Sequence, residues 1–225
     1  MATVEAQTGP PGHLAGTMAA ALAQAAAHQA FELFKDKAFQ RLAGFDGMDQ
    51  TERDRIFNEL VVAHLVLSML ILEAPDLRVS TEFRDHLVEV KTLVPKAYVD
   101  NLRNLGVKKE HCRVWEKLLT LRYEEYAKDR HGVRSAAMQL EGAKKPLDLE
   151  DLSRIQLFVP VQAAAIGCHD HVCRGKTDGR DELFKTTLKA LARFYGDIRI
   201  RFEGGKITIW MRARRLWRRL FGGSE

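Results

Sequence analysis

The sequence of 225 residues lacks the short motifs that mark common catalytic and cofactor sites. It contains no nucleophile elbow, no dinucleotide-binding glycine fingerprint and no His-Glu-x-x-His zinc motif. Gly175-Lys176-Thr177 ends like a phosphate-binding loop, but Asp170 stands where that loop needs its first glycine. These absences weigh against an enzyme and direct attention to interaction surfaces.

Cysteine is also scarce, with only Cys112, Cys168 and Cys173. An odd number of cysteines in a chain of this length argues against a disulfide framework. No basic residue precedes Lys35, so the start of the sequence lacks the charged-then-apolar layout of a secretory signal. No apolar run reaches the length of about 20 residues that crosses a bilayer. We therefore expect a cytoplasmic protein, with any membrane contact peripheral and on the inner face.

The longest apolar run is residues 60–72, LVVAHLVLSMLIL, in which only His64 and Ser68 have polar side chains. A helix without a polar face must be buried by other helices. His64 and Ser68 lie four residues apart, so they share a face of that helix and each needs a hydrogen-bond partner. A hydrogen-bonded core histidine is favoured over a metal ligand or a proton-transfer group. The run predicts one mainly α-helical domain organised around it.

Periodicity and capping residues predict about six helices in a bundle spanning residues 17–196. Residues 1–16, rich in glycine, proline and small polar residues, are predicted to be disordered. Residues 131–147 show no clear period and are predicted to form a long loop with at most one helical turn. The expected helices are residues 17–43, a central helix opened by a capping box of Thr51 and Asp54, a helix from Ser80 to Gly106 with a kink at Pro95, residues 108–130, a helix capped by Asp148, and residues 181–195.

After residue 196 the hydrophobic period changes from 3.6 to 2. Ile198, Ile200 and Phe202 alternate with charged residues as far as Gly204-Gly205, and the alternation resumes beyond the glycines. A Gly-Gly pair suits a two-residue turn because both central positions need positive φ. This pattern predicts a C-terminal β-hairpin at residues 197–210. Its apolar side would need cover from the bundle, a partner chain or a membrane.

The positive charge of the protein is concentrated at its C-terminus. The formal net charge is +5, and five arginines between positions 212 and 219 account for it, because the remaining 30 basic residues balance 30 acidic ones. A nucleic-acid binder usually spreads basic residues over a face. Because the arginines are clustered in this short segment, any contact with an anionic partner is expected at one end of the molecule.

The segment 210–221, WMRARRLWRRLF, carries the strongest functional signal. On a helix, its apolar residues would form one face and its arginines would occupy the rest. We therefore predict a basic amphipathic helix and tail at residues 211–225. This pattern is typical of a helix in the interface of an anionic membrane. The alternatives are a last packed helix with solvated arginines and an arginine-rich contact with RNA or DNA. The predicted contact residues are Trp210, Arg212, Arg214, Arg215, Leu216, Trp217, Arg218, Arg219, Leu220 and Phe221.

Residues 168–173, CHDHVC, place four potential zinc ligands close together: Cys168, His169, His171 and Cys173. A helix puts only residues three or four apart on one face, so pairs of these side chains can share a ligand shell but all four cannot. The spacing matches no common zinc template. A helix end with solvated histidines and a buried thiol is therefore favoured over a zinc site.

A second candidate metal face consists of Glu82, His86 and Glu89, with Glu59 and Glu73 flanking the apolar run. Inward carboxylates and histidines in a helical bundle can hold two iron or manganese ions, but the defining Glu-x-x-His pair is missing. Solvated helix faces are therefore favoured over a di-metal centre. The favoured function is therefore a non-catalytic helical interaction or scaffold protein that docks peripherally on an anionic membrane or membrane complex. A metal-dependent helical enzyme is the alternative, and a nucleic-acid-binding protein is the third hypothesis.

Overall fold

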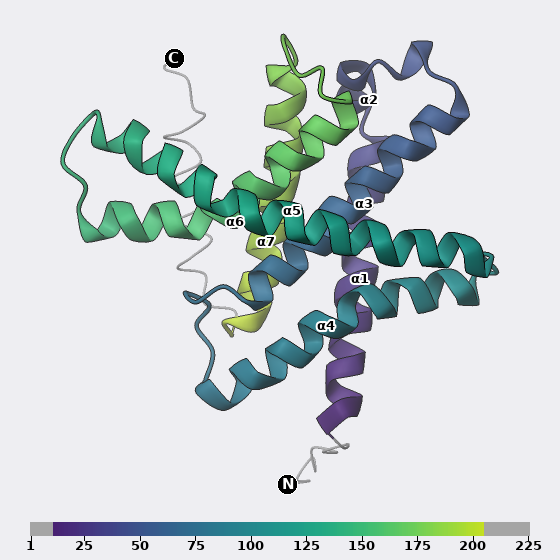
Figure 1. The fold of residues 1–225 in the computed structure, drawn as a ribbon, viewed down its shortest axis with the longest axis horizontal. Coiled ribbons are helices and arrows are strands. Elements are labelled where there is room, and N and C mark those ends of the chain that lie inside the picture. The colour runs from purple at the N-terminus through teal and green to yellow at the C-terminus, as the bar shows by residue number, and fades with distance from the viewer. Residues whose placement is uncertain (1–10, 205–225) are drawn as a thin grey trace, which may run out of the picture.

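The computed structural model describes residues 11–204, and this part of the chain is almost entirely helical. The prediction of a helical bundle is confirmed (Figure 1). The described elements are α1 Pro11–Lys35, α2 Lys37–Ala43, the 3-10 turn η1 Phe45–Gly47, α3 Gln50–Leu72, α4 Thr81–Asn104, α5 Lys109–Gly142, α6 Leu149–Cys173 and α7 Asp181–Phe202.

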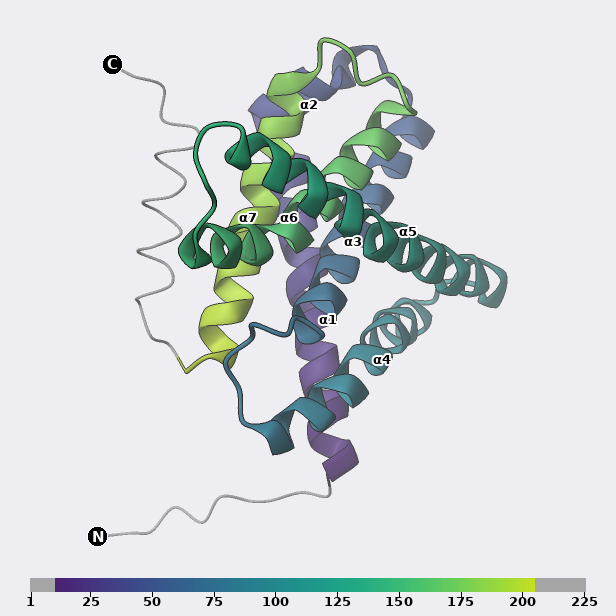
Figure 2. The same ribbon diagram turned by 60° about the vertical axis from the view of Figure 1, so that its left-hand side comes forward.

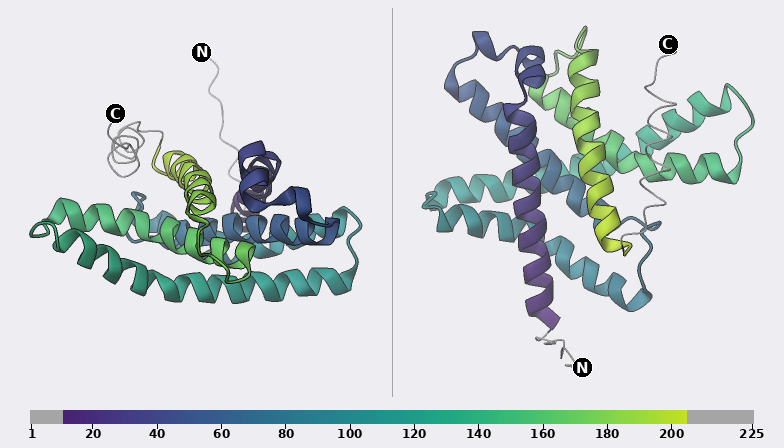
Figure 3. Two further views of the ribbon diagram at one scale, coloured as in Figure 1. Left: turned by 90° about the horizontal axis from the view of Figure 1, so that it is seen from above. Right: turned by 180° about the vertical axis from the view of Figure 1, so that it is seen from behind.

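Helix α3 forms the centre of the bundle. It contacts α1, α4, α5, α6 and α7, and every residue from Leu60 to Leu72 is buried. Seen from above, α1 and α7 lie on one side of the molecule and the long α5 on the opposite side, with α3 and α6 between them (Figure 3). Figure 2 shows the same stacking from a third direction. The predicted organisation around residues 60–72 is therefore correct.

Among the described helices, α3 alone is long and apolar enough to cross a membrane, but 83% of its most apolar window is buried inside the bundle. That burial makes it the core helix of this fold. Its low amphipathicity follows from its position, since a helix surrounded by neighbours needs no polar face.

Several predicted helix starts are correct. The Ser80 side chain accepts a hydrogen bond from the Phe83 backbone N–H, and Asp148 forms a reciprocal capping box with Asp151. The predicted start of the central helix is wrong by two residues. Asp49, rather than Thr51, is its N-cap and accepts from the Glu52 N–H. Pro95, where a kink is predicted, lies inside α4, and α6 also contains an internal proline, Pro160.

The N-terminal boundary also differs from the prediction. Residues 11–16, predicted to be disordered, form the first turns of α1, while residues 1–10 lie outside the described part. Proline is tolerated at the first helical position, so Pro11 starts the helix rather than blocking it. The predicted single helix 17–43 is divided at Asp36, whose side chain caps α2 by accepting from the Phe39 N–H at 2.9 Å.

The predicted loop at residues 131–147 is wrong over most of its length. Helix α5 continues to Gly142, and with α6 it forms an arm that extends beyond the body of the molecule (Figure 1). One interior glycine, Gly132, costs a helix only about 1 kcal/mol relative to alanine. Ile155 and Asp151 of α6 are buried in the arm, so packing between the two helices outweighs that cost.

The first strand of the predicted hairpin is also wrong, because residues 198–202 are the last turns of α7. Ile198 is buried and continues the helical spacing set by Leu191, Phe194 and Tyr195. Five residues of apolar–charged alternation are too few to separate a strand from the end of an amphipathic helix. The predicted second strand, at 206–209, lies outside the described residues.

Candidate functional site

The ten predicted contact residues from Trp210 to Phe221 lie outside the described residues. The other predicted site residues all lie within 11–204, and the structure places them on different sides of their helices.

The four zinc candidates of α6 point in three directions. Cys168 is fully buried in the core. His169, predicted to be solvated, is also buried and packs edge-on against Phe184 of α7, with 5.5 Å between ring centroids. His171 instead faces α5, and its Nε2 lies 2.7 Å from a carboxylate oxygen of Glu125. The Cys173 thiol is buried near Arg180. The helical geometry therefore separates these side chains, as the spacing predicted, and residues 11–204 contain no group of three or more His, Cys, Asp or Glu side chains that could hold a metal ion.

The two thiols of α6 are also unsuited to nucleophilic chemistry. Burial raises the pKa of Cys168 and that of Cys173, which keeps both sulfurs protonated near neutral pH. Burial likewise lowers the pKa of His169. Each shift reflects a group withdrawn from water rather than one activated by a neighbour.

The second candidate metal cluster is not assembled either. His86 lies 3.8 Å from Glu89 on the same helix, but the two carboxylates that flank the apolar run face other partners. Glu59 pairs with Arg122, and Glu73 pairs with Arg130; both arginines belong to α5. The carboxylates of α3 and α4 are therefore engaged in separate contacts.

His64 and Ser68 obtain their hydrogen bonds from the backbone of their own helix. The Ser68 hydroxyl donates to the His64 carbonyl at 2.9 Å. His64 Nδ1 lies 2.7 Å from the Leu60 carbonyl and must carry the proton, because a carbonyl only accepts. His64 Nε2 is buried without a hydrogen-bond partner, and the ring packs edge-on against Phe194 of α7. The interpretation of His64 as a core histidine agrees with this environment.

His64 should make the fold sensitive to acid. Burial lowers its pKa from 6.5 to about 4, so between these pH values the unfolded chain binds a proton that the folded chain does not. Stability therefore falls as the pH falls, by about 2 kcal/mol between pH 7 and pH 5 from this group alone. Urea unfolding at pH 7 and pH 5 measures this decrease in the free energy of unfolding. In His64→Leu the decrease should be about 2 kcal/mol smaller than in the wild type. The part due to His169 should remain.

The exposed His28→Gln variant provides the control for this measurement and should follow the wild type. An equal loss of stability on acidification in His64→Leu and wild type would show that His64 is not the group responsible.

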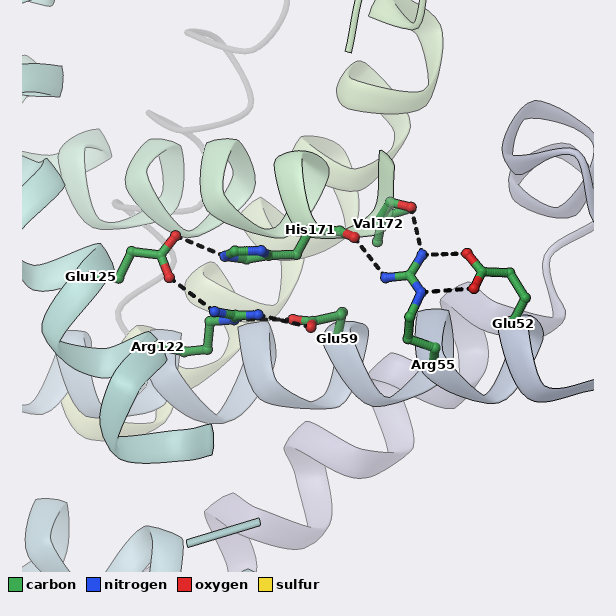
Figure 4. A network of polar contacts seen from close by, with 7 residues as sticks. All are labelled: Glu52, Arg55, Glu59, Arg122, Glu125, His171 and Val172. Carbon is green, nitrogen blue, oxygen red and sulfur yellow. Dashed lines mark hydrogen bonds and ion pairs between the residues drawn. The ribbon is translucent and has the colours of Figure 1, made fainter. Parts of the chain in front are cut away.

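One ionic network connects α3, α5 and α6 (Figure 4). Arg55 of α3 donates to the last carbonyls of α6, those of His171 and Val172, at 2.7 and 2.9 Å. Its guanidinium also holds Glu52, which in turn pairs with Arg174. Arg55 therefore satisfies carbonyl groups that a helix C-terminus leaves without intrahelical donors. Hydrogen bonding from Arg55, with a further contribution from Arg174, lowers the pKa of Glu52 to about 2.

The same network continues along α5. Arg122 contacts Glu59 of α3 through two nitrogens, at 3.0 and 3.3 Å, and Glu125 of its own helix at 3.2 Å. Glu125 also accepts the contact from His171. The carboxylates of Glu52, Glu59 and Glu125 are each paired with an arginine, so these charges neutralise one another at the junction of three helices. This arrangement is that of a structural brace.

A second cluster joins α3, α4 and α5 around Glu73. Its carboxylate accepts hydrogen bonds from the Tyr123 hydroxyl at 2.6 Å and from Lys91 Nζ at 3.1 Å, and it pairs with Arg130 at 2.7 Å. Three donors on one carboxylate leave it little capacity to act as a base or a metal ligand. The cluster ties the C-terminal end of the core helix to both of its neighbours.

A third cluster surrounds Arg199, which is only 2% exposed. Its guanidinium pairs with Asp76 at 2.6 Å and Glu203 at 2.5 Å, and it also donates to the Tyr195 hydroxyl at 2.7 Å. Sequence reasoning assigned residues 198–202 to a strand and missed this cluster. The spacing of Tyr195, Arg199 and Glu203, four residues apart, is the helical signal that could have revealed it.

Sequence reasoning also missed a row of cations on the exposed side of α7. Lys185, Lys189, Arg193 and Arg201 are all exposed, and only Lys185 has an ion-pair partner among residues 11–204, namely Glu182. The charges of the three internal networks are mutually paired, whereas Lys189, Arg193 and Arg201 take no part in them.

Comparisons of the chain with protein-family models, with curated proteins and with solved structures found no match.

Proposed function

We propose that the protein is a non-catalytic helical interaction protein that docks peripherally on an anionic membrane, or on a membrane complex, through residues 210–221. The composition of this segment carries the proposal. Two tryptophans and a phenylalanine would lie at headgroup depth on one face of a helix, and five arginines would contact lipid phosphates. Each cation near an acidic lipid surface adds about 1 kcal/mol, so five contribute substantially beside the apolar burial.

The charge pairing inside the bundle supports a non-catalytic function. The buried Glu59 is held by Arg122, and the half-buried Glu73 by three donors. General bases and metal ligands need lone pairs aimed at a site that a substrate or ion can occupy. These carboxylates instead direct their oxygens at other helices.

The end of α7 supports a role for the segment that follows it. Glu203, the last residue but one that the structure describes, bonds both Arg199 and the backbone N–H of Arg78. Arg199 in turn binds Asp76 in the connection between α3 and α4. The chain therefore leaves the bundle from a braced position, which is suitable for presenting a docking segment at a defined place on the molecule.

Sedimentation with vesicles tests this proposal on the full-length protein. The protein should bind vesicles of phosphatidylcholine with phosphatidylserine more tightly than pure phosphatidylcholine vesicles, and binding should weaken with added salt because exposed charges are screened. Trp217→Ala/Phe221→Ala keeps every charge but removes two rings. It should abolish the part of binding that resists high salt.

Val114→Ala/Leu121→Ala provides the matched control, since it removes two exposed apolar side chains from α5. This variant should bind as the wild type does. Equal sedimentation of wild type with neutral and anionic vesicles, or with neither, would overturn the proposal. Binding to RNA or DNA that depends on the arginines, without vesicle binding, would favour the nucleic-acid hypothesis instead.

A further inference from the structure

Four cations form a row along the exposed side of α7. Lys185, Lys189, Arg193 and Arg201 share a spacing of four or eight residues, and the exposed Asp197 fills the one gap. Residues four apart on a helix are surface neighbours, so the first three cations are adjacent. The row covers most of the helix from its first turns to the braced exit at Glu203.

The internal energetics of α7 do not explain this row. Like charges four residues apart destabilise a helix by a few tenths of a kcal/mol per pair, and Lys185, Lys189 and Arg193 make two such pairs. Within residues 11–204, Lys189, Arg193 and Arg201 have no ion-pair partner, whereas the buried Arg199 of the same helix has two. Asp197 lies four residues from both Arg193 and Arg201 and offsets these like-charge pairs, so the row neither stabilises nor destabilises the helix appreciably. Its unpaired cations are available to an external anionic partner.

The row also continues the charge asymmetry of the sequence. Residues 185–225 contain 11 of the 35 basic residues but only 3 of the 30 acidic ones, which is a net charge of +8. The preceding 184 residues contain 24 basic and 27 acidic residues, a net charge of −3. The positive field of the protein thus begins in the bundle, on α7, rather than at the arginines of the C-terminal segment.

The neighbour of α7 on the same side of the molecule has no acidic residue over most of its length. Helix α1 lies on the side that α7 occupies (Figure 3), and it has no acidic residue between Pro11 and Phe31. It also exposes Leu14, which is 52% accessible. A surface that combines cations with neutral and apolar residues fits a lipid headgroup region better than a nucleic-acid backbone, which offers mainly phosphate contacts.

We infer that the exposed cations of α7 are a second lipid-contacting surface, which lays the α1–α7 side of the bundle against the anionic bilayer engaged by residues 210–221. This inference rests on the proposed function and adds the orientation of the bundle on the membrane. The aromatic residues would anchor the C-terminal segment, and Lys189, Arg193 and Arg201 would hold the bundle against the phosphates. The C-terminal segment would then not be a free tether.

A pair of charge-matched variants tests the orientation. Lys189→Gln/Arg193→Gln should weaken binding of the full-length protein to phosphatidylcholine–phosphatidylserine vesicles about 10- to 30-fold at low salt, since two surface cations contribute about 1 kcal/mol each. Lys117→Gln/Lys128→Gln removes the same charge from exposed positions on α5, on the opposite side of the bundle. This control should change binding less than about 3-fold, because its charges lie away from the bilayer and are screened.

The outcomes separate this inference from the proposed function. If Trp217→Ala/Phe221→Ala weakens vesicle binding but the α7 and α5 variants bind equally well, the proposed function stands and the orientation is wrong. If the wild-type protein binds no anionic vesicles, both are overturned. If the α7 variant loses affinity for RNA but keeps its affinity for vesicles, the row is a nucleic-acid contact and the inference fails. Circular dichroism should show the α7 and α5 variants folded, because their substituted side chains are exposed.

Discussion

Gly167→Ala is expected to destabilise the fold by about 3 kcal/mol, at the upper end of overpacking effects. A Cβ atom at this position of α6 would lie 2.1 Å from Cε1 and 2.6 Å from Cδ1 of Tyr126. Tyr126 is fully buried, so its ring has no free volume into which to turn. The absence of a side chain at position 167 is therefore what allows α5 and α6 to approach each other. Chemical denaturation measures the loss directly.

Two further variants make this prediction specific. Gly132→Ala on α5 adds the same methyl group where nothing lies within 4 Å, and it should stabilise by about 0.5–1 kcal/mol because alanine is the better helix former. In a Tyr126→Leu background the ring is gone, and Gly167→Ala should cost less than about 1 kcal/mol. An equal cost in both backgrounds would show that contact with Tyr126 is not the cause.

Arg199→Met should destabilise the protein by about 3–5 kcal/mol, the range for breaking a buried ion pair by removing one partner. The guanidinium is 2% exposed, and its loss would leave the Asp76 and Glu203 carboxylates without their cation. A linear methionine side chain retains much of the apolar packing, so the loss should come mainly from the uncompensated carboxylates. Thermal or urea unfolding near neutral pH is the measurement.

Arg201→Met is the matched control, because it makes the same substitution two residues away at an exposed position. It should change the free energy of unfolding by less than about 0.5 kcal/mol. Equal effects of the two substitutions would mean that the Arg199 cluster contributes no net stability. The end of α7 at Glu203 would then not be held in place by this cluster.

The parts of the fold that could be predicted from the sequence are those set by local chemistry. The uniformly apolar run at 60–72 could only be a buried helix, and Ser80 and Asp148 are effective caps wherever a helix starts. The extent of α5 could not be derived in this way. Residues 131–142 have weak periodicity, and their helical state depends on packing against α6, the next helix along the chain, which the local preferences of single residues do not describe.

In the candidate site, too, local features could be predicted from the sequence and long-range contacts could not. The scattering of Cys168, His169, His171 and Cys173 followed from helical spacing alone. The pairing of Glu59 with Arg122, 63 residues later, depends on which helices lie side by side, and no local pattern encodes that. The strand predicted at 198–202 failed because alternating Ile and Arg residues satisfy either period over so short a stretch. The decisive feature was Arg199 binding Asp76, 123 residues earlier in the chain.

The central position of α3 also affects how the chain is made. Residues 60–72 are covered partly by α6 and α7, and α7 begins at Asp181, 109 positions after Leu72. At typical translation rates of 5–20 residues per second, roughly 5 to 20 s pass between synthesis of the apolar run and synthesis of its last cover. During that interval the nascent chain presents a long apolar helix without its final neighbours. We expect newly made chains to engage ribosome-associated chaperones until α7 has left the exit tunnel.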